Sequence, residues 1–139
     1  MTAAPQSSAA GLPVRSGEDP WTDAEIAEIR AELEDEALAL RREIGQAESG
    51  IAERIGDSVP AAGDDEADAS SKVMQREHDL ALTQNTRTLL DQTEHALARI
   101  NEGTYGVCES CGQAVGKARL QAFPRATLCV QCKQRQERR

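Results

Sequence analysis

The sequence predicts an all-α protein in which a long antiparallel helical hairpin is followed by a four-cysteine module and a short terminal helix. Three features lead to this prediction. Apolar residues recur about every 3.6 positions in two long stretches. An acidic stretch with Pro and Gly, residues 56–71, separates them. Two Cys-x-x-Cys pairs then fall close together near the end of the sequence.

The composition limits the class of protein. The chain has 139 residues, enough for one domain with a tail, and its single Trp, Tyr and Phe offer little material for a large globular core. Residues 108–139 hold seven basic and two acidic residues, a net charge of +5; because the whole chain carries −8, residues 1–107 carry −13. Such an acidic body argues against binding to phosphate backbones along its length.

The first twenty residues and the lack of a long apolar stretch suggest in which compartment the protein works. These residues contain neither the basic start nor the apolar run of a signal peptide, and no stretch approaches the length of a membrane span. We therefore expect a cytoplasmic protein, without a membrane partner, whose cysteines stay reduced. Residues 1–20 are rich in Ala, Ser, Pro and Gly, which predicts a disordered N-terminal tail.

The first helix is expected from Asp23 to about Ile55. Thr22 and Glu25 fit a capping box, and Trp21 with Ile26 fits a hydrophobic staple. At about 1.5 Å per residue, this helix would be roughly 50 Å long. Its narrow apolar stripe predicts one arm of a coiled coil: Ile26, Ile29, Leu33, Ala37, Leu40, Ile44, Ala47, Ile51 and Ile55.

Residues 56–71 are expected to form an acidic loop at the tip of the hairpin. Pro60, two glycines and five acidic residues make this stretch a poor helix and a poor core. The second helix should begin near Ser70 or Ser71, either of which can act as its N-cap, and should end at Gly103 in a left-handed conformation. The hairpin would thus occupy residues 21–103.

The apolar stripe of the second helix is patchier than that of the first. Its expected members are Val73, Leu80, Leu90, Leu97 and Ile100. Four polar positions interrupt this stripe and should weaken helix pairing in the middle of the hairpin: Arg76, Thr83, Arg87 and either Thr93 or Glu94. Two helices that each bury one stripe are marginally stable alone, so the open end of the hairpin needs an anchor.

The four cysteines provide that anchor. Cys108-x-x-Cys111 is followed after seventeen residues by Cys129-x-x-Cys132, a spacing typical of a tetrahedral structural zinc site. A redox dithiol and a pair of disulfides are the alternatives. Because protein ligands fill all four positions, we expect one Zn²⁺ with a structural role in a module at 104–139, which ends in a short helix from Val130 to Arg139.

The basic residues around this module admit two interpretations. The segment from Glu18 to Glu36 contains nine acidic residues and only one basic residue, and an antiparallel hairpin returns the module to it. We expect much of the basic cluster to face this segment, since a DNA-reading zinc module normally adds a helix that enters the major groove. Contact with DNA remains the alternative.

The combination resembles the DksA/TraR family of bacterial transcription regulators. Three segments of the module carry the resemblance: Tyr-Gly-Val-Cys-Glu-Ser-Cys-Gly at 105–112, Ala-Arg-Leu-Gln-Ala-Phe-Pro at 118–124, and Leu-Cys-Val-Gln-Cys-Lys at 128–133. With the hairpin, the resemblance covers the chain from about residue 21 onward. It implies a protein that binds RNA polymerase without DNA sequence preference and inserts its hairpin into the secondary channel.

The resemblance also assigns a role to the tip. Family members use an Asp-x-x-Asp-x-Ala motif there; Asp65 and Asp68 match its acids, and Ser70 stands in place of the alanine. Asp64 and Glu66 are further candidates for contact with the polymerase active site. Carboxylates at this position suit Mg²⁺ or basic side chains.

We therefore expect a monomeric, non-enzymatic regulator of transcription initiation that binds RNA polymerase. Nothing in the sequence matches a phosphate-binding loop, a nucleophile elbow or a metal-hydrolase motif. Two other functions remain open. A secondary-channel factor could stimulate transcript cleavage by holding a second Mg²⁺ with the tip acids. A zinc-finger DNA-binding or adaptor protein could use the hairpin for dimerisation.

Overall fold

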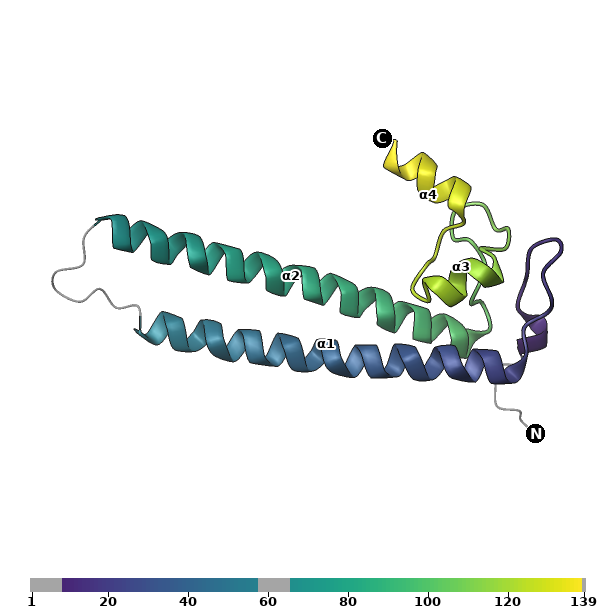
Figure 1. The fold of residues 1–139 in the computed structure, drawn as a ribbon, viewed down its shortest axis with the longest axis horizontal. Coiled ribbons are helices and arrows are strands. Elements are labelled where there is room, and N and C mark those ends of the chain that lie inside the picture. The colour runs from purple at the N-terminus through teal and green to yellow at the C-terminus, as the bar shows by residue number, and fades with distance from the viewer. Residues whose placement is uncertain (1–8, 58–65, 139) are drawn as a thin grey trace. The chain divides into compact units, whose positions relative to one another are not determined.

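The computed structural model describes residues 9–57 and 66–138, with side chains for all of these except 10, 51–57 and 66–68. Its elements are η1 (Ala9–Gly11), α1 (Asp23–Asp57), α2 (Glu66–Glu102), α3 (Lys117–Ala122) and α4 (Val130–Glu137) (Figure 1). The predicted helical fold is confirmed. No helix in the described ranges is long and apolar enough to cross a membrane.

The chain divides into two units. The base unit comprises Met1–Glu36 and Gln92–Arg139, and the hairpin unit comprises Ala37–Asp91. In both units α1 and α2 lie side by side and run in opposite directions (Figure 1). An Arg87–Glu48 ion pair joins them in the hairpin unit, and a hydrogen bond from Arg30 to Asn101 joins them in the base unit.

The start of α1 follows the predicted capping geometry. The Thr22 N–H donates to Glu25 Oε1 at 2.9 Å, and the Glu25 N–H donates to Thr22 Oγ1 at 3.1 Å. Trp21 and Ile26 are buried in the same core cluster, which agrees with a hydrophobic staple. The apolar stripe of α1 is also confirmed in its described part: Ile26, Ile29, Leu33, Ala37 and Leu40 are buried, and Ile44 and Ala47 are half-buried.

Residues 9–20 differ from the disordered tail that their composition predicts. Ala9 and Leu12 are buried, and the Ala9 N–H donates to Asp23 Oδ1 at 3.3 Å. The composition misleads here because the segment does not need a core of its own. Its few apolar side chains join a core that the rest of the base unit already provides.

The described helices shorten the predicted tip loop at both ends. α1 continues to Asp57, and α2 begins at Glu66, four residues before the expected start at Ser70. Residues 66–69, Glu-Ala-Asp-Ala, combine good helix formers with acids that favour a helix N-terminus, which explains the earlier start. Ser70 is an exposed residue of α2, and Asp64 and Asp65 lie outside the described residues.

The face of α2 that lies against α1 is more polar than the apolar stripe in the sequence predicts. Val73 and Leu80 are 47% and 52% exposed, so the prediction that they face α1 is wrong. Thr83 and Thr93, expected to interrupt the stripe, are instead buried. Buried or half-buried positions recur every three or four residues along this face, and they include Arg76, Asp79, Thr83, Thr86, Leu90, Thr93, Leu97 and Ile100.

This polar face leaves a hollow between the helices of the hairpin unit. It is lined by Glu43, Ile44, Ala47, Asp79, Leu82, Thr83 and Thr86. The Thr83 hydroxyl donates to the Asp79 carbonyl oxygen at 2.9 Å, so this hydrogen bond lies within α2. Few apolar contacts between the helices mean that this part of the hairpin is weakly held.

We predict that Thr83→Val stabilises the protein by about 1 kcal/mol, because it replaces a buried hydroxyl, whose hydrogen bond lies within its own helix, with an apolar methyl group. Urea denaturation with an unchanged m-value would measure the gain. Thr88→Val is the matched control, since Thr88 makes the same type of bond, to the Gln84 carbonyl, but is exposed. An equal gain in both variants would contradict the explanation.

Candidate metal centre

The end of α2 fixes the approach to the first cysteine pair. Gly103 has φ 81°, the predicted left-handed conformation, and the Thr104 N–H donates to the Arg99 carbonyl at 2.9 Å. The Arg99 side chain is buried and donates from Nη2 to the carbonyl oxygens of Thr104 and Val107, each at 2.7 Å. Sequence reasoning missed Arg99, although a basic residue in the last helical turn is a known carbonyl partner.

The first cysteine pair lies in a tight turn. Val107 and Ala114 form an antiparallel bridge, and the Cys108 N–H donates to the Gln113 carbonyl at 2.7 Å. The Gly112 N–H donates to the Cys108 carbonyl at 3.0 Å. Gly112 has φ 78°, a left-handed conformation that glycine adopts without steric cost.

The second pair lies at the start of α4. Cys129 is the N-cap of this helix and Cys132 lies in its first turn. The expected terminal helix is therefore present. A bond from the Glu109 N–H to the Thr127 carbonyl, at 2.9 Å, ties the first turn to the segment that leads into α4.

The four sulfur atoms gather as a tetrahedral zinc site requires. All four cysteines are free thiols, and their Sγ atoms lie within 4.8 Å of one another. Zn–S bonds of about 2.3 Å place the sulfurs of a tetrahedral site roughly 3.8 Å apart, and Cys111 Sγ lies 3.9 Å from Cys129 Sγ. Cys108, Cys129 and Cys132 are buried. The residues fit one structural Zn²⁺ with no position left for a substrate.

The surroundings shift the pKa values of Cys108 and Cys132 in opposite directions. Burial raises the pKa of Cys108, but backbone N–H groups of Cys111, Cys129 and Ser110 outweigh it and bring the pKa to about 6. The Ser110 hydroxyl lowers the pKa of Cys132, but burial and the other cysteines raise it to about 11. The other cysteines oppose the ionisation of Cys132, so four thiolates this close need a cation beside them. Bound Zn²⁺ would supply this compensating charge.

We predict that Cys111→Ser lowers zinc content from one ion per chain and destabilises the base unit, because zinc binding supplies folding free energy that so small a core cannot replace. Metal analysis and thermal unfolding by circular dichroism would measure both effects. The control is Gln131→Ala, an exposed residue between Cys129 and Cys132 that offers no sulfur. Full zinc content in Cys111→Ser would contradict a four-sulfur site.

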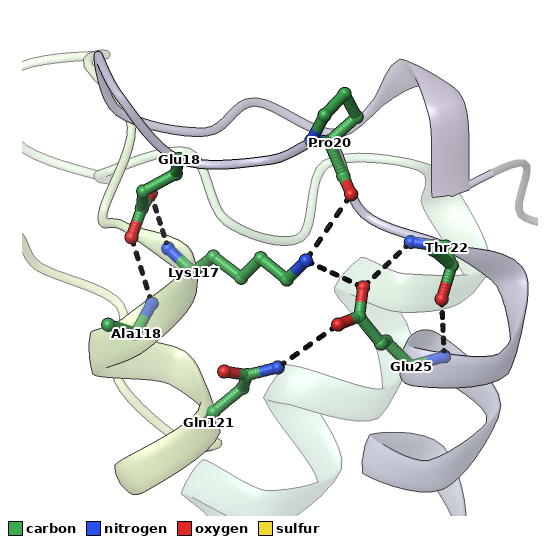
Figure 2. A network of polar contacts seen from close by, with 7 residues as sticks. All are labelled: Glu18, Pro20, Thr22, Glu25, Lys117, Ala118 and Gln121. Atoms are coloured by element: carbon green, nitrogen blue, oxygen red, sulfur yellow. Dashed lines mark hydrogen bonds and ion pairs between the residues drawn. The ribbon is translucent and has the colours of Figure 1, made fainter.

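The basic residues around the site contact the acidic segment as expected in two places. Lys117 Nζ lies 2.7 Å from Glu25 Oε1, and Arg125 pairs with Glu36. Figure 2 shows the Lys117 contacts, in which the ammonium group also donates to the Pro20 carbonyl at 3.3 Å. Both pairs lie within the base unit, so part of the module's positive charge is neutralised inside it.

The ion pair between Lys117 and Glu25 predicts a measurable shift in the pKa of the Glu25 carboxyl group. Hydrogen bonds from the Lys117 ammonium and then from the Thr22 N–H hold the pKa of Glu25 below its ordinary value of 4.5. The pair therefore stabilises the folded protein above pH 4.5, and this contribution is lost as pH falls through the lowered pKa. We expect an NMR titration of the Glu25 carboxyl to have its midpoint below 4.5 and to move back in Lys117→Met. A midpoint at or above 4.5 in the unaltered protein would contradict the pairing.

Comparisons with known proteins agree with this architecture. Residues 103–138 match the prokaryotic dksA/traR C4-type zinc finger. The RNA polymerase-binding transcription factor DksA of Caulobacter vibrioides is 40% identical over 75 residues, which are 54% of this chain and 53% of that protein, so the chain spans about half the length of this relative. The structure of transcription factor DksA2 from Pseudomonas aeruginosa has a TM-score of 0.69 and 33% identity, covering 84% of this chain and 85% of that one.

A longer match includes the hairpin. The RNA polymerase-binding transcription factor DksA of Escherichia coli strain K12 is 30% identical over 122 residues, which cover 86% of this chain and 76% of that protein. A likeness of this extent cannot arise from the zinc finger alone, which accounts for residues 103–138. From the finger and the hairpin together it follows that this chain belongs to the DksA/TraR family.

Proposed function

We propose that this protein binds bacterial RNA polymerase and regulates transcription initiation as a monomeric, non-enzymatic cytoplasmic factor without DNA sequence preference. The observation that carries the proposal is the match over 86% of the chain to a factor named for binding RNA polymerase. A match of this length must include the two helices of 35 and 37 residues and at least part of the finger. In this proposal the hairpin enters the secondary channel and the finger stabilises its base.

The acidic tip is the part proposed to act on the polymerase. Asp65 directly precedes the first residue of α2 in the sequence, Asp68 lies in the first turn, and Ser70 follows as an exposed residue. In the sequence, Asp64 and Asp65 directly precede α2, and Glu66 and Asp68 lie in its first turn. Negative charge delivered to a magnesium-dependent centre can alter it without covalent chemistry.

We predict that Asp68→Asn retains binding to core RNA polymerase but loses the effect on transcription, because it removes a tip charge and leaves the rest of the chain intact. Pull-down and multi-round transcription in vitro would separate the two properties. Asp91→Asn is the matched control, since it removes an exposed acidic residue from the same helix outside the tip.

Three outcomes would contradict parts of the proposal. Loss of polymerase binding in Asp68→Asn would make the tip a docking element. Faster shortening of transcripts in backtracked complexes would indicate a cleavage-stimulating factor. A dimer that retards duplex DNA at physiological salt would indicate a DNA-binding module.

A further inference from the structure

The segment that precedes α1 lies directly on the zinc module. A Cβ at Gly116 would lie 3.0 Å from Arg15 Cδ, and one at Gly106 would lie 3.7 Å from the Pro13 carbonyl oxygen. Gly106 and Gly116 flank the first cysteine pair in the sequence, and both are buried. Arg15 also donates from Nη1 to the Ala114 carbonyl at 3.3 Å. The segment therefore packs against the backbone on both sides of this pair.

Glu18 of this segment holds the first turn of α3. Its Oε1 accepts the Lys117 N–H at 2.9 Å and its Oε2 accepts the Ala118 N–H at 3.0 Å (Figure 2). The N-cap residue of α3 is Gly116, which has no side chain to offer these N–H groups. A carboxylate about a hundred positions earlier in the chain thus performs the capping role, and it also accepts the Arg15 N–H at 2.8 Å.

The contacts of Lys117 add a second attachment. Its ammonium group bonds to Glu25 and to the Pro20 carbonyl, and lies 5.5 Å from the centre of the Trp21 ring. Trp21 in turn packs against Tyr105, with the ring centres 6.4 Å apart. The start of α3 is therefore held from residues 18–25 by both its backbone and its first side chain.

α3 connects this attachment to the second cysteine pair. It lies in the seventeen residues between the two pairs. Leu120 is fully buried, and Arg119 Nε donates to the carbonyl oxygen of Leu128, the residue before Cys129, at 3.1 Å. Tyr105 also donates its hydroxyl to the Pro124 carbonyl at 2.8 Å. A loose α3 would free the segment that delivers Cys129 and Cys132 to the metal.

We propose that residues 9–25 form an intramolecular latch on the zinc module, and that Glu18 is a positioning residue which, by capping α3, slows the loss of zinc. The proposal concerns metal retention in the isolated protein and does not depend on polymerase binding. It assigns a task to a segment that ends in the first turn of α1 and lies outside the matched finger.

The test is the rate at which the zinc-loaded full-length protein gives up its metal to a coloured chelator at neutral pH. Glu18→Ala removes both acceptors, and we expect release about tenfold faster, the ratio that corresponds to one charge-assisted hydrogen bond. Glu18→Gln keeps a neutral acceptor and should fall between Glu18→Ala and the unaltered protein. Asp19→Asn is the matched control, because Asp19 is the next residue, acidic and exposed; its rate should not change.

A second variant separates the capping by Glu18 from the other contacts of the latch. Lys117→Met removes the ammonium contacts but retains the backbone N–H that Glu18 accepts, so it should speed release less than Glu18→Ala. All variants should begin with one zinc ion per chain and unchanged helix content. Release from Glu18→Ala at the rate of the unaltered protein, or equal acceleration in Asp19→Asn, would overturn the proposal. Glu18→Gln as fast as Glu18→Ala would overturn the role of the accepted hydrogen bonds.

Discussion

The gathering of four sulfur atoms within 4.8 Å is the constraint on which the base unit depends. The two cysteine pairs are seventeen residues apart in the sequence, so their sulfurs lie together only when the chain between the pairs is folded. Its own apolar material is slight: Val115 and Leu120 are its buried aliphatic side chains among the described residues. Metal binding, and packing against residues from α1, α2 and the N-terminal segment, must supply what this short stretch lacks.

The helices show which parts of a fold can be predicted from a pattern of apolar residues. In α1 the apolar residues and the buried face coincide, and the capping box lies where Thr22 and Glu25 place it. In α2 they do not coincide, since Thr83 is buried while Leu80 is half-exposed. The position of the partner helix decides which face of a helix is buried. The pattern of apolar residues identifies this face only where polar residues are absent from it.

The metal centre was more predictable than its supports. Zinc ligation requires particular residues at a fixed spacing, so Cys108, Cys111, Cys129 and Cys132 are recognisable without any structure. The residues that hold this site act through single long-range contacts that leave no periodic signal. Glu18 reaches α3 across about a hundred positions, and α3 itself has only six residues. Such contacts arise from the folded arrangement and have no local pattern in the sequence.

The distribution of contacts also favours a protein partner over nucleic acid. The finger's net charge of +5 overstates its available positive charge, since Lys117 and Arg125 pair with acidic residues and Arg119 donates to a carbonyl. The described basic residues near α4 are Lys133, Arg135 and Arg138. Neutralising three phosphates gives a salt-dependence slope of only about −2.7. Together with the net charge of −13 on residues 1–107, this small basic surface supports the proposal of a protein partner that presents basic side chains to the hairpin.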